Sequence, residues 1–172
     1  MKSTPQTMVR IFFLFSFLFV LSAGCSEAID QSHTQAGVLH QQKNLEGLEK
    51  AYFASGCFWC VEAIFESVKG VEEVISGYCG GSKENADYRK VSSGQTKHAE
   101  SVEVYYNPDI VSYDILLEVF FGSHDPTTLN RQGPDAGPQY RSAIFYRNQE
   151  EKTKAENYVA KLEQNAAYDA PI

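Results

Sequence analysis

Two cysteines three positions apart, Cys57 and Cys60, are the residues of this sequence best suited to redox chemistry. Residues 50–55 have the apolar character of a short buried strand, and from Phe58 onward apolar residues recur at helical spacing. Cys57 therefore lies where a strand ends and a helix begins, and the unpaired backbone N–H groups of a helix start stabilise a thiolate. Cys60 lies about one helical turn further on, within reach of a disulfide. This spacing predicts a reactive cysteine with a resolving partner; the alternative is a pair of buried structural cysteines.

The elements around this pair indicate an α+β domain. Apolar patterns predict four strands, over residues 50–55, 71–78, 100–106 and 140–147. Helical spacing predicts three helices, over residues 58–69, 112–121 and 148–166. Ser112 and Asn148 are suitable capping residues for the last two helices. The order βαββαβα matches a ferredoxin-like two-layer sandwich, with a βαββαβ core and a C-terminal helix.

This topology would gather distant polar residues at one edge of the sheet. With right-handed crossovers, the first two strands run parallel and the other two run opposite to them. The C-terminal ends of the first pair and the N-terminal ends of the second pair then share an edge. Six residues are predicted at that edge or in the loops that open onto it: Cys57, Cys79, Tyr88, Glu100, Asp135 and Tyr140. The connectivity alone therefore predicts one pocket.

A pocket of this kind has the groups for thiol chemistry on a polar oxygen. Near apolar surface, the carboxyl group of Glu100 would keep its proton and act as a general acid. The hydroxyl groups of Tyr88 and Tyr140 can bind an oxygen atom, and Phe58 and Trp59 can hold a small apolar group. We expect a substrate with a polarised oxygen beside a methyl group. Taken singly, each side chain is more typical of packing or of the surface, whereas together around the nucleophile they indicate a site.

The N-terminal part of the chain has the pattern of an export signal. A positive start is followed by an apolar segment over residues 11–21, too short to span a bilayer, and by small residues before Cys25. This arrangement resembles the bacterial lipoprotein signal, in which acyl chains on Cys25 anchor the mature chain to a membrane; the alternative is an ordinary cleaved signal. We expect a signal peptide over residues 1–25, a polar, flexible tether over 26–48 and the folded domain over 49–172. The domain would then face the periplasm or the cell exterior.

The composition suits a single domain and excludes nucleic-acid binding. The 172 residues suggest one domain with tails, and 43% of them are hydrophobic, which is enough for a core. The net charge is −7, and the sequence contains no cluster of Lys and Arg that could bind phosphate groups. We therefore expect a monomer without DNA or RNA partners.

Several motifs resemble those of the A-type peptide-methionine sulfoxide reductases, in the order and spacing of that family. The similarity covers about residues 52–147. The motifs are Gly56-Cys57-Phe58-Trp59, Gly77-Tyr78-Cys79-Gly80-Gly81, Tyr88-Arg89, Gly94-Gln95-Thr96-Lys97-His98-Ala99-Glu100, His124-Asp125-Pro126 and the segment from Arg131 to Ile144. The resemblance implies an enzyme that repairs methionine sulfoxide in oxidised proteins, with free methionine sulfoxide as an alternative substrate. It also implies the S epimer at sulfur and no metal or organic cofactor.

The resemblance assigns a role to five residues that would contact or organise the reacting groups. Cys57 would attack the sulfoxide sulfur, and Glu100 would protonate the sulfoxide oxygen. Tyr88 and Tyr140 would donate hydrogen bonds to that oxygen. Asp135 would help to organise the pocket.

The remaining roles concern the methyl group and the return of the enzyme to its reduced form. Phe58 and Trp59 would hold the methyl group of the substrate. The sulfenic acid left on Cys57 would condense with a neighbouring thiol, either Cys60 or Cys79. Thioredoxin, or an exported dithiol equivalent to it, would then reduce the disulfide.

Two features depart from the family pattern. Cys60 stands where glycine is usual, as in a subgroup whose resolving thiol lies in the same motif; Cys79 is the second candidate. Family members usually continue past the final helix with a strand and an aromatic, His-containing segment that covers the pocket, whereas this sequence stops at Ile172. We expect a fragment, a truncated gene product or a shortened form, with lower stability and lower activity.

Two other protein classes fit part of the pattern. Two cysteines separated by two residues in an exported chain are also typical of a thioredoxin-like disulfide oxidoreductase. That class does not account for Glu100 and the tyrosines, and its element order differs. A zinc module would use four ligands: Cys57, Cys60, Cys79 and His98. The second ligand pair of such a module lacks the close spacing usual for zinc.

Overall fold

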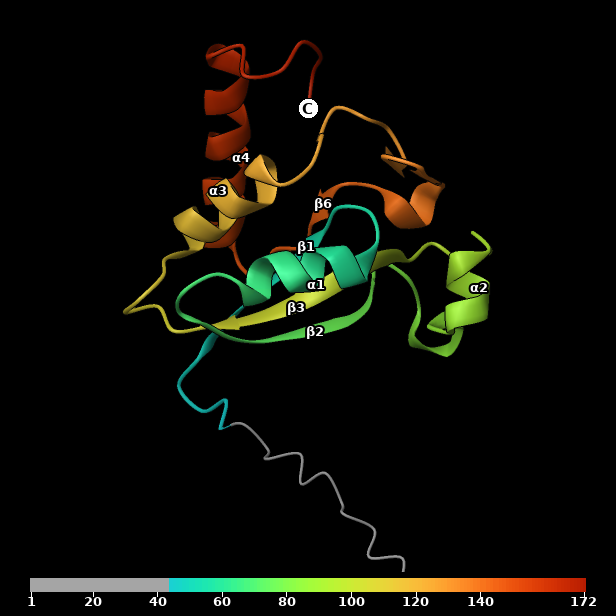
Figure 1. Cartoon of the computed structure of the whole chain (residues 1–172), viewed down its shortest axis with the longest axis horizontal. Coiled ribbons are helices and arrows are strands. Elements are labelled where there is room, and N and C mark those ends of the chain that lie inside the picture. The colour runs from blue at the N-terminus through green and yellow to red at the C-terminus, as the bar shows by residue number, and fades with distance from the viewer. Residues whose placement is uncertain (1–43) are drawn as a thin grey trace, which may run out of the picture. The chain divides into compact units, whose positions relative to one another are not determined.

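The computed structural model describes residues 44–172 (Figure 1). The expected signal peptide over residues 1–25 lies outside the described residues, as does most of the expected tether. The first strand, β1, covers Glu49–Ala54. None of the helices within residues 44–172 combines the length and the apolar character needed to cross a membrane.

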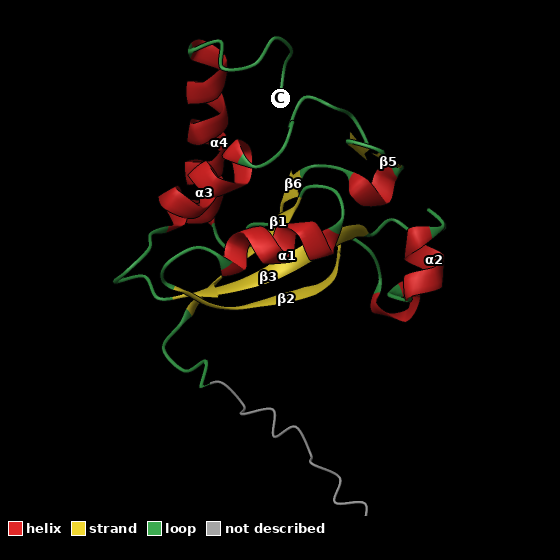
Figure 2. Cartoon of the chain, in the orientation of Figure 1, coloured by secondary structure: helices red, strands yellow, loops and turns green. Residues whose placement is uncertain are grey.

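The centre of the fold is a four-stranded sheet in the order β2-β3-β1-β6, in which all neighbours are antiparallel (Figure 2). Its other strands are β2 (Val71–Cys79), β3 (Ala99–Tyr106) and β6 (Ala143–Ile144). Because β1 and β2 both run opposite to β3, the first two strands point the same way, as the sequence predicts. The end of β1 and the end of β2 therefore lie at the same edge as the start of β3.

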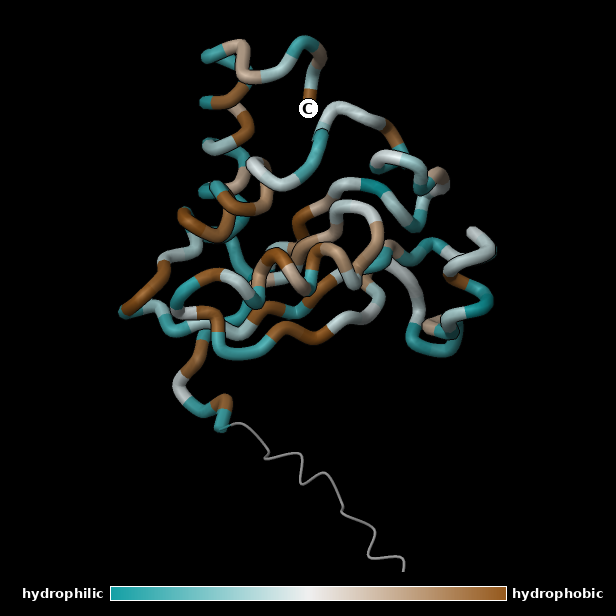
Figure 3. Tube along the Cα trace, viewed as in Figure 1, coloured by the Kyte–Doolittle hydropathy of each residue, from teal (hydrophilic) through white to brown (hydrophobic). Residues whose placement is uncertain are grey.

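One face of the sheet carries α1 (Phe58–Glu66) and α3 (Tyr113–Gly122). Phe53 of β1 is fully buried where these elements meet, with its ring 4.9 Å from Phe65 of α1 and 5.1 Å from Phe120 of α3. Apolar stretches of α1 lie over those of the strands behind it (Figure 3). This packing fixes α1, and with it the N-terminal end of α1, against the sheet.

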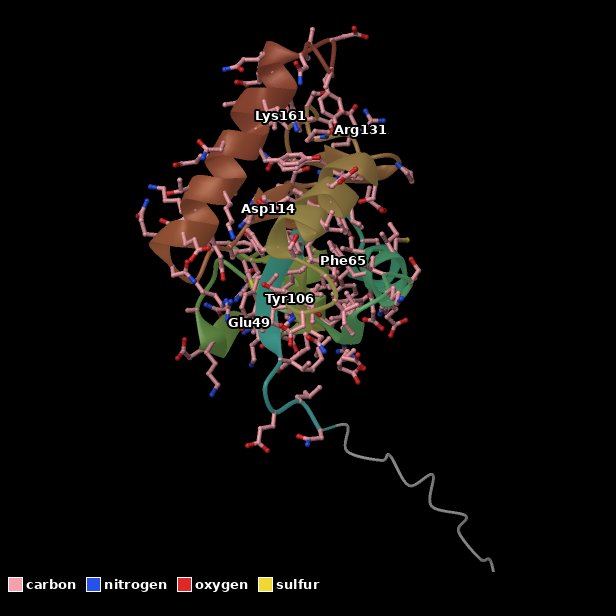
Figure 4. All side chains as sticks on the ribbon, turned by 90° about the vertical axis from the view of Figure 1, so that its left-hand side faces the viewer. Glu49, Phe65, Tyr106, Asp114, Arg131 and Lys161 are labelled. Atoms are coloured by element: carbon pink, nitrogen blue, oxygen red, sulfur yellow. The ribbon has the colours of Figure 1, made fainter. Side chains whose placement is uncertain are left out.

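The last helix, α4 (Gln149–Gln164), packs on α3. The ring of Phe121 stacks on Tyr158 at 5.3 Å, and Lys154 lies 3.8 Å from Asp114, which faces α4 (Figure 4). The predicted start of α4 is confirmed, because the Asn148 side chain accepts a hydrogen bond from the N–H of Glu151 at 2.9 Å. Ser112 caps α3 in the same way.

The prediction of a strand over residues 140–147 is wrong in extent, since β6 holds only Ala143 and Ile144. Gly137 has φ +139°, a conformation that favours glycine. It opens a short 3₁₀ turn, η2 (Pro138–Tyr140), closed by a hydrogen bond from Tyr140 N to the oxygen of Gly137 at 3.0 Å. The backbone therefore turns, rather than extends, at the residue expected to begin the strand.

Two segments expected to be loops contain short elements. The first holds η1 (Lys83–Asn85) and α2 (Tyr88–Ser92). Asp87 caps α2, because its side chain accepts hydrogen bonds from two backbone N–H groups of the helix. The second holds a two-stranded ribbon of β4 (Arg131–Gln132) and β5 (Asp135–Ala136). In addition, α1 ends at residue 66 instead of 69. Elements this short have no hydrophobic period that a sequence pattern can reveal.

Candidate active site

Cys57 lies at the strand-to-helix junction that the sequence predicts. It is the extended residue just before α1, and its carbonyl oxygen accepts from the N–H groups of Cys60 at 3.1 Å and Val61 at 3.3 Å. Gly56 before it has φ +93°, and a Cβ there would lie 2.8 Å from the side chain of Gln132. Only glycine therefore allows the sharp turn that places the thiol at the start of the helix.

Glu100 lies beside this junction and is buried, with 3% of its surface exposed. Its Oε2 accepts a hydrogen bond from the N–H of Phe58, the first residue of α1, at 3.2 Å. The first free N–H of the helix is thus directed to the carboxyl group of Glu100 and not to the Cys57 sulfur. Burial raises the pKa of Glu100, the Phe58 N–H opposes that shift, and the nearby charge of Asp135 adds to it. Glu100 therefore holds its proton more firmly than an exposed glutamate, as a general acid must.

Tyr140 joins this group from the η2 turn. Burial raises the pKa of Tyr140, and the charges of Glu100, Asp135 and Cys57 raise it further. Cys57 and Asp135 line one cavity, Glu100 accepts from the residue after Cys57, and the η2 turn that carries Tyr140 contacts β3 and β5. Four predicted site residues from four separate segments are thus gathered in one region of the fold. The phenol of Tyr140 keeps its proton and can donate a hydrogen bond.

Trp59 and Tyr88 form an aromatic surface at the mouth of the site. Trp59 is 61% exposed, and its ring lies 6.3 Å from that of Tyr88, the first residue of α2, in a stacked arrangement. Phe58 lies beneath, 5.3 Å from Trp59 and only 6% exposed. Phe58 thus belongs mainly to the core, while Trp59 and Tyr88 present apolar surface to a ligand.

Cys57 and Cys60 share a small cavity of about 220 Å³. Both cysteines are free thiols; Cys57 is partly buried and Cys60 is exposed. The pKa of Cys60 is raised mainly by burial, and the nearby charges of Cys57 and Asp135 raise it further. The other lining residues are Ser55, Val61, Ile64, Ser123, His124, Gln132, Gly133 and Pro134. The cavity leaves room for the two sulfur atoms to react with each other or with an incoming thiol.

Cys79 is not part of this group. In the register of β2 and β3, Tyr78 pairs with Glu100 and Cys79 pairs with Ala99. Because successive side chains of a strand point to opposite faces, Cys79 points away from the face that holds Glu100. Burial raises the pKa of Cys79, and a hydrogen bond with Ser101 opposes that shift. Of the two predicted resolving thiols, the structure brings only Cys60 next to Cys57.

The same geometry separates the four ligands of the zinc alternative, because Cys79 lies on the other face. Among residues 44–172, no three His, Cys, Asp or Glu side chains are arranged to hold a metal ion. A larger hollow of about 480 Å³ lies between α3, α4 and β6, and none of the predicted site residues lines it. The position of the thiols, and not cavity size, identifies the site.

Sequence reasoning overlooked three residues that the structure places at the site. Tyr78 shares the face of Glu100, and its ring lies 5.8 Å from Phe58. Strand alternation could have revealed it, since Tyr78 and Cys79 are neighbours and must face opposite ways. His124 and Gln132 line the thiol cavity. Both lie in motifs that resemble those of the family, but the local pattern does not predict their place at the thiol cavity, because long loops bring them there.

Comparison with known proteins decides the family. The family model described as peptide methionine sulfoxide reductase matches residues 49–172. The chain belongs to the peptide methionine sulfoxide reductase family. It is 53% identical to the peptide methionine sulfoxide reductase MsrA of Chromobacterium violaceum over 125 residues, which are 73% of this chain and 71% of that protein. The MsrA of Natronomonas pharaonis is 53% identical over 122 residues, 71% of this chain and 68% of that protein.

Solved structures of the family share the fold. Methionine sulfoxide reductase A of Corynebacterium diphtheriae superposes with a TM-score of 0.63 at 36% identity, over 73% of this chain and 62% of that one. Reduced Mxr1 from Saccharomyces cerevisiae gives a TM-score of 0.66 at 29% identity, over 70% of this chain and 71% of that one. This member of the peptide methionine sulfoxide reductases is therefore an enzyme that reduces methionine sulfoxide to methionine.

Proposed function

We propose that the pocket around Cys57 reduces methionine S-sulfoxide in proteins by thiol chemistry, with Glu100 as the proton donor. The placement of Glu100 carries this assignment. Its carboxyl group is buried beside the start of α1, and the influences on its pKa are burial, the Phe58 N–H and Asp135, none of which is a cation. A carboxyl group in such surroundings is suited to giving up a proton to a developing oxyanion.

In the first step, the Cys57 thiolate attacks the sulfoxide sulfur while Glu100 gives its proton to the sulfoxide oxygen, which forms a bond between the two sulfur atoms and leaves a hydroxyl group on the substrate sulfur. The hydroxyl group then passes to the Cys57 sulfur while the S–S bond and the S–O bond of the substrate break, which leaves a sulfenic acid on Cys57. Methionine leaves with its sulfur reduced by two electrons, and Cys57 is oxidised by two electrons.

Binding of the substrate divides between polar and apolar groups. Tyr88 and Tyr140 bind the sulfoxide oxygen, and Asp135 holds the pocket around the two thiols. The exposed ring of Trp59, backed by Phe58, holds the methyl group. An oxygen bound on one side and a methyl group on the other distinguish the two epimers at sulfur.

In the second step, the Cys60 thiol attacks the sulfenic acid of Cys57. A disulfide forms and the oxygen leaves as water, with one proton from each thiol-derived group. The cavity that Cys57 and Cys60 share supports Cys60 as the resolving residue. An external dithiol then reduces the disulfide. Mxr1 of Saccharomyces cerevisiae has been solved in complex with Trx2, and we assign a dithiol of that class, or an exported equivalent, to this chain.

The test is dithiothreitol-driven reduction of a peptide that contains racemic methionine sulfoxide. We expect the wild-type chain to consume half of the racemate and stop, and Cys57→Ser to consume none. Consumption of both epimers, or activity in Cys57→Ser, contradicts the proposal.

We also propose that the enzyme is exported, with acyl chains on Cys25 as its membrane anchor. The pattern of residues 1–25 supports this location. Mass spectrometry of the N-terminal peptide from a bacterial membrane fraction tests it, and a soluble chain that keeps Met1 would contradict it. For the fold, the antiparallel order β2-β3-β1-β6, with α1 and α3 on one face, supports the ferredoxin-like class.

A further inference from the structure

Gln139 connects two segments of the site that lie far apart in the sequence. It is in the η2 turn, directly before Tyr140, and only 6% of its surface is exposed. Its Nε2 donates a hydrogen bond to the backbone oxygen of Ser92 at 3.0 Å, across 47 positions of sequence. Ser92 is the last residue of α2, and Tyr88 is the first. One buried side chain thus joins the turn that carries one phenol to the helix that carries the other.

The amide group of Gln139 has a single orientation. The Ser92 oxygen can only accept a hydrogen bond, so Nε2 must face it. The amide oxygen then lies between two glycines: a Cβ on Gly137 would be 2.5 Å from it and a Cβ on Gly94 3.4 Å from it. This oxygen has no hydrogen-bond partner among the described residues, and it rests against the Cα hydrogens of the glycines. A buried acceptor is rarely left unpaired. Because the amide oxygen is unpaired within residues 44–172, the hydrogen bond from Nε2 to Ser92 is the contact that decides the orientation of the amide group.

The helix held by Gln139 is weakly anchored elsewhere. α2 has five residues, of which only Val91 is buried. A second bridge, from Arg141 to the oxygen of Lys97 at 3.1 Å, is exposed to solvent and reaches the chain beyond the helix. A helix this short is not stable by itself, so tertiary contacts determine where Tyr88 lies.

Gln139 also fixes the segment that carries Tyr140, because the two residues are neighbours in the η2 turn, which is closed by the hydrogen bond from Tyr140 N to the oxygen of Gly137. The Gln139 side chain, hydrogen-bonded to Ser92, therefore ties this turn to α2. Both phenols of the pocket depend on this one hydrogen bond.

We infer that Gln139 is a positioning residue that fixes Tyr88 and Tyr140 at the separation needed to bind one sulfoxide oxygen. The inference rests on the function proposed above. It assigns to Gln139 no contact with the substrate; it acts through the two tyrosines. Because a misplacement of about 1 Å in a binding group can reduce a rate by about a hundredfold, a single lost hydrogen bond can have a measurable effect here.

The first test is Gln139→Met, which keeps the length of the side chain and removes the donor. We expect kcat/KM for a methionine sulfoxide peptide to fall by about tenfold or more, measured well below the melting temperature of each protein. The matched control is Gln95→Met, since Gln95 is an exposed glutamine near the same helix. We expect the control to keep its kcat/KM within about twofold of the wild-type value.

The second readout does not depend on catalysis. Trp59 is the only tryptophan of the chain, and it stacks against Tyr88. A shift of α2 changes the surroundings of the indole ring, so we expect the tryptophan emission to change in Gln139→Met and to stay the same in Gln95→Met. If the wild-type chain reduced no sulfoxide, the proposed function would fail, yet the emission would still report whether Gln139 positions Tyr88.

The third test uses Gln139→Glu as a conservative replacement that can be switched by pH. A protonated carboxyl group can donate to the Ser92 oxygen, whereas a carboxylate cannot. We expect the activity of this variant, divided by that of the wild type at each pH, to be highest in acid and to fall as pH rises. A Gln139→Met variant with kcat/KM within about twofold of the wild type and unchanged emission overturns the inference, as does a flat pH ratio for Gln139→Glu.

Discussion

Two glutamates on strand β3 show how one strand serves two different purposes. Glu100 and Glu103 are three positions apart, so they point to opposite faces of the sheet. Glu100 lies on the face covered by α1, beside Cys57. Glu103 lies on the other face, where its register partners are Tyr52 of β1 and Ile75 of β2. Both side chains are at least partly buried, and their surroundings nevertheless shift their pKa values in opposite directions.

The difference comes from the partners of each carboxyl group. Burial alone would raise the pKa of Glu103, but hydrogen bonds from Lys50 and Tyr52, each at 2.8 Å, lower it overall. Glu100 has the Phe58 N–H alone, and burial raises its pKa. Glu103 is paired with the Lys50 cation, so it stays ionised and has a structural role. Within the described part of the chain, no cation acts on the pKa of Glu100, so Glu100 keeps its proton and can donate it. Cys57 and Cys79 are separated in the same way: Cys57 lies on the side of the sheet that holds Glu100, and Cys79 lies on the side that holds Glu103.

The largest expected effect separates the two glutamates by activity. Glu100→Gln keeps an oxygen for the Phe58 N–H but removes the proton donor, so we expect kcat to fall by about 10²- to 10⁴-fold. The matched control, Glu103→Gln, should keep its kcat within about twofold. Single-turnover methionine formation measures both. Equal losses in the two variants would mean that the faces do not differ in function.

The pH dependence of the wild-type enzyme sharpens this comparison. Because the pKa of Glu100 is raised, its proton is available to a higher pH than that of an exposed glutamate, and it is lost above that point. The rate of sulfoxide reduction in a single turnover should therefore decrease as pH rises through the raised pKa. The residual rate of Glu100→Gln should lack this decrease.

The next effect separates the thiols. We expect Cys60→Ser to reduce thioredoxin-driven turnover by about tenfold or more, while a single turnover still forms methionine and leaves a sulfenic acid on Cys57 that a dione reagent traps. Cys79→Ser should turn over at the wild-type rate within about twofold, since Cys79 lies on the other face. The reverse result would show that the sheet opens or that Cys79 resolves the sulfenic acid by another route.

Much of this arrangement follows from sequence patterns. The change from strand to helical spacing places Cys57 at the start of α1, and the order of the elements predicts the edge that gathers Glu100, Asp135 and Tyr140. These features depend on long apolar repeats and on handedness rules, which act over whole elements.

What the sequence does not reveal depends on single positions or on distant contacts. A shift of one residue in the register of β2 would move the Cys79 side chain to the other face of the sheet. The helix α2 is too short to show a period, and its capping residue Asp87 is its only local signal. The link between Gln139 and Ser92 spans 47 positions. It exists only because the turn at Gly137 and the end of α2 are folded against each other.

A smaller effect compares the two glutamates by stability. The folded pKa of Glu103 is lowered, so its contribution to stability is present above the ordinary glutamate pKa and is lost as pH falls through the lowered value. We expect Glu103→Gln to lower the free energy of unfolding by about 1 kcal/mol at about pH 7, and by less in acid. Urea unfolding at several pH values measures this.

Glu100 should behave in the opposite way. Its folded pKa is raised, so the folded state loses stability as pH rises above the ordinary glutamate pKa. Glu100→Gln should therefore be more stable than the wild type at about pH 7, with the difference closing in acid. If both variants were destabilised at neutral pH, the contrast between the two carboxyl groups would be wrong.

The smallest effect concerns Tyr52, whose hydroxyl group donates to Glu103 at 2.8 Å. Tyr52→Phe removes this hydrogen bond and leaves the ion pair of Lys50 with Glu103 in place, so we expect a loss of about 0.5–1 kcal/mol and unchanged activity. Burial and the hydrogen bond to Glu103 raise the pKa of Tyr52 to about 12. The unfolded chain ionises first as pH rises, so this part of the stability is complete below the ordinary tyrosine pKa and decreases as pH approaches 12. The difference between the wild type and Tyr52→Phe should therefore narrow in strong alkali; a constant difference would show that the hydroxyl group does not depend on Glu103.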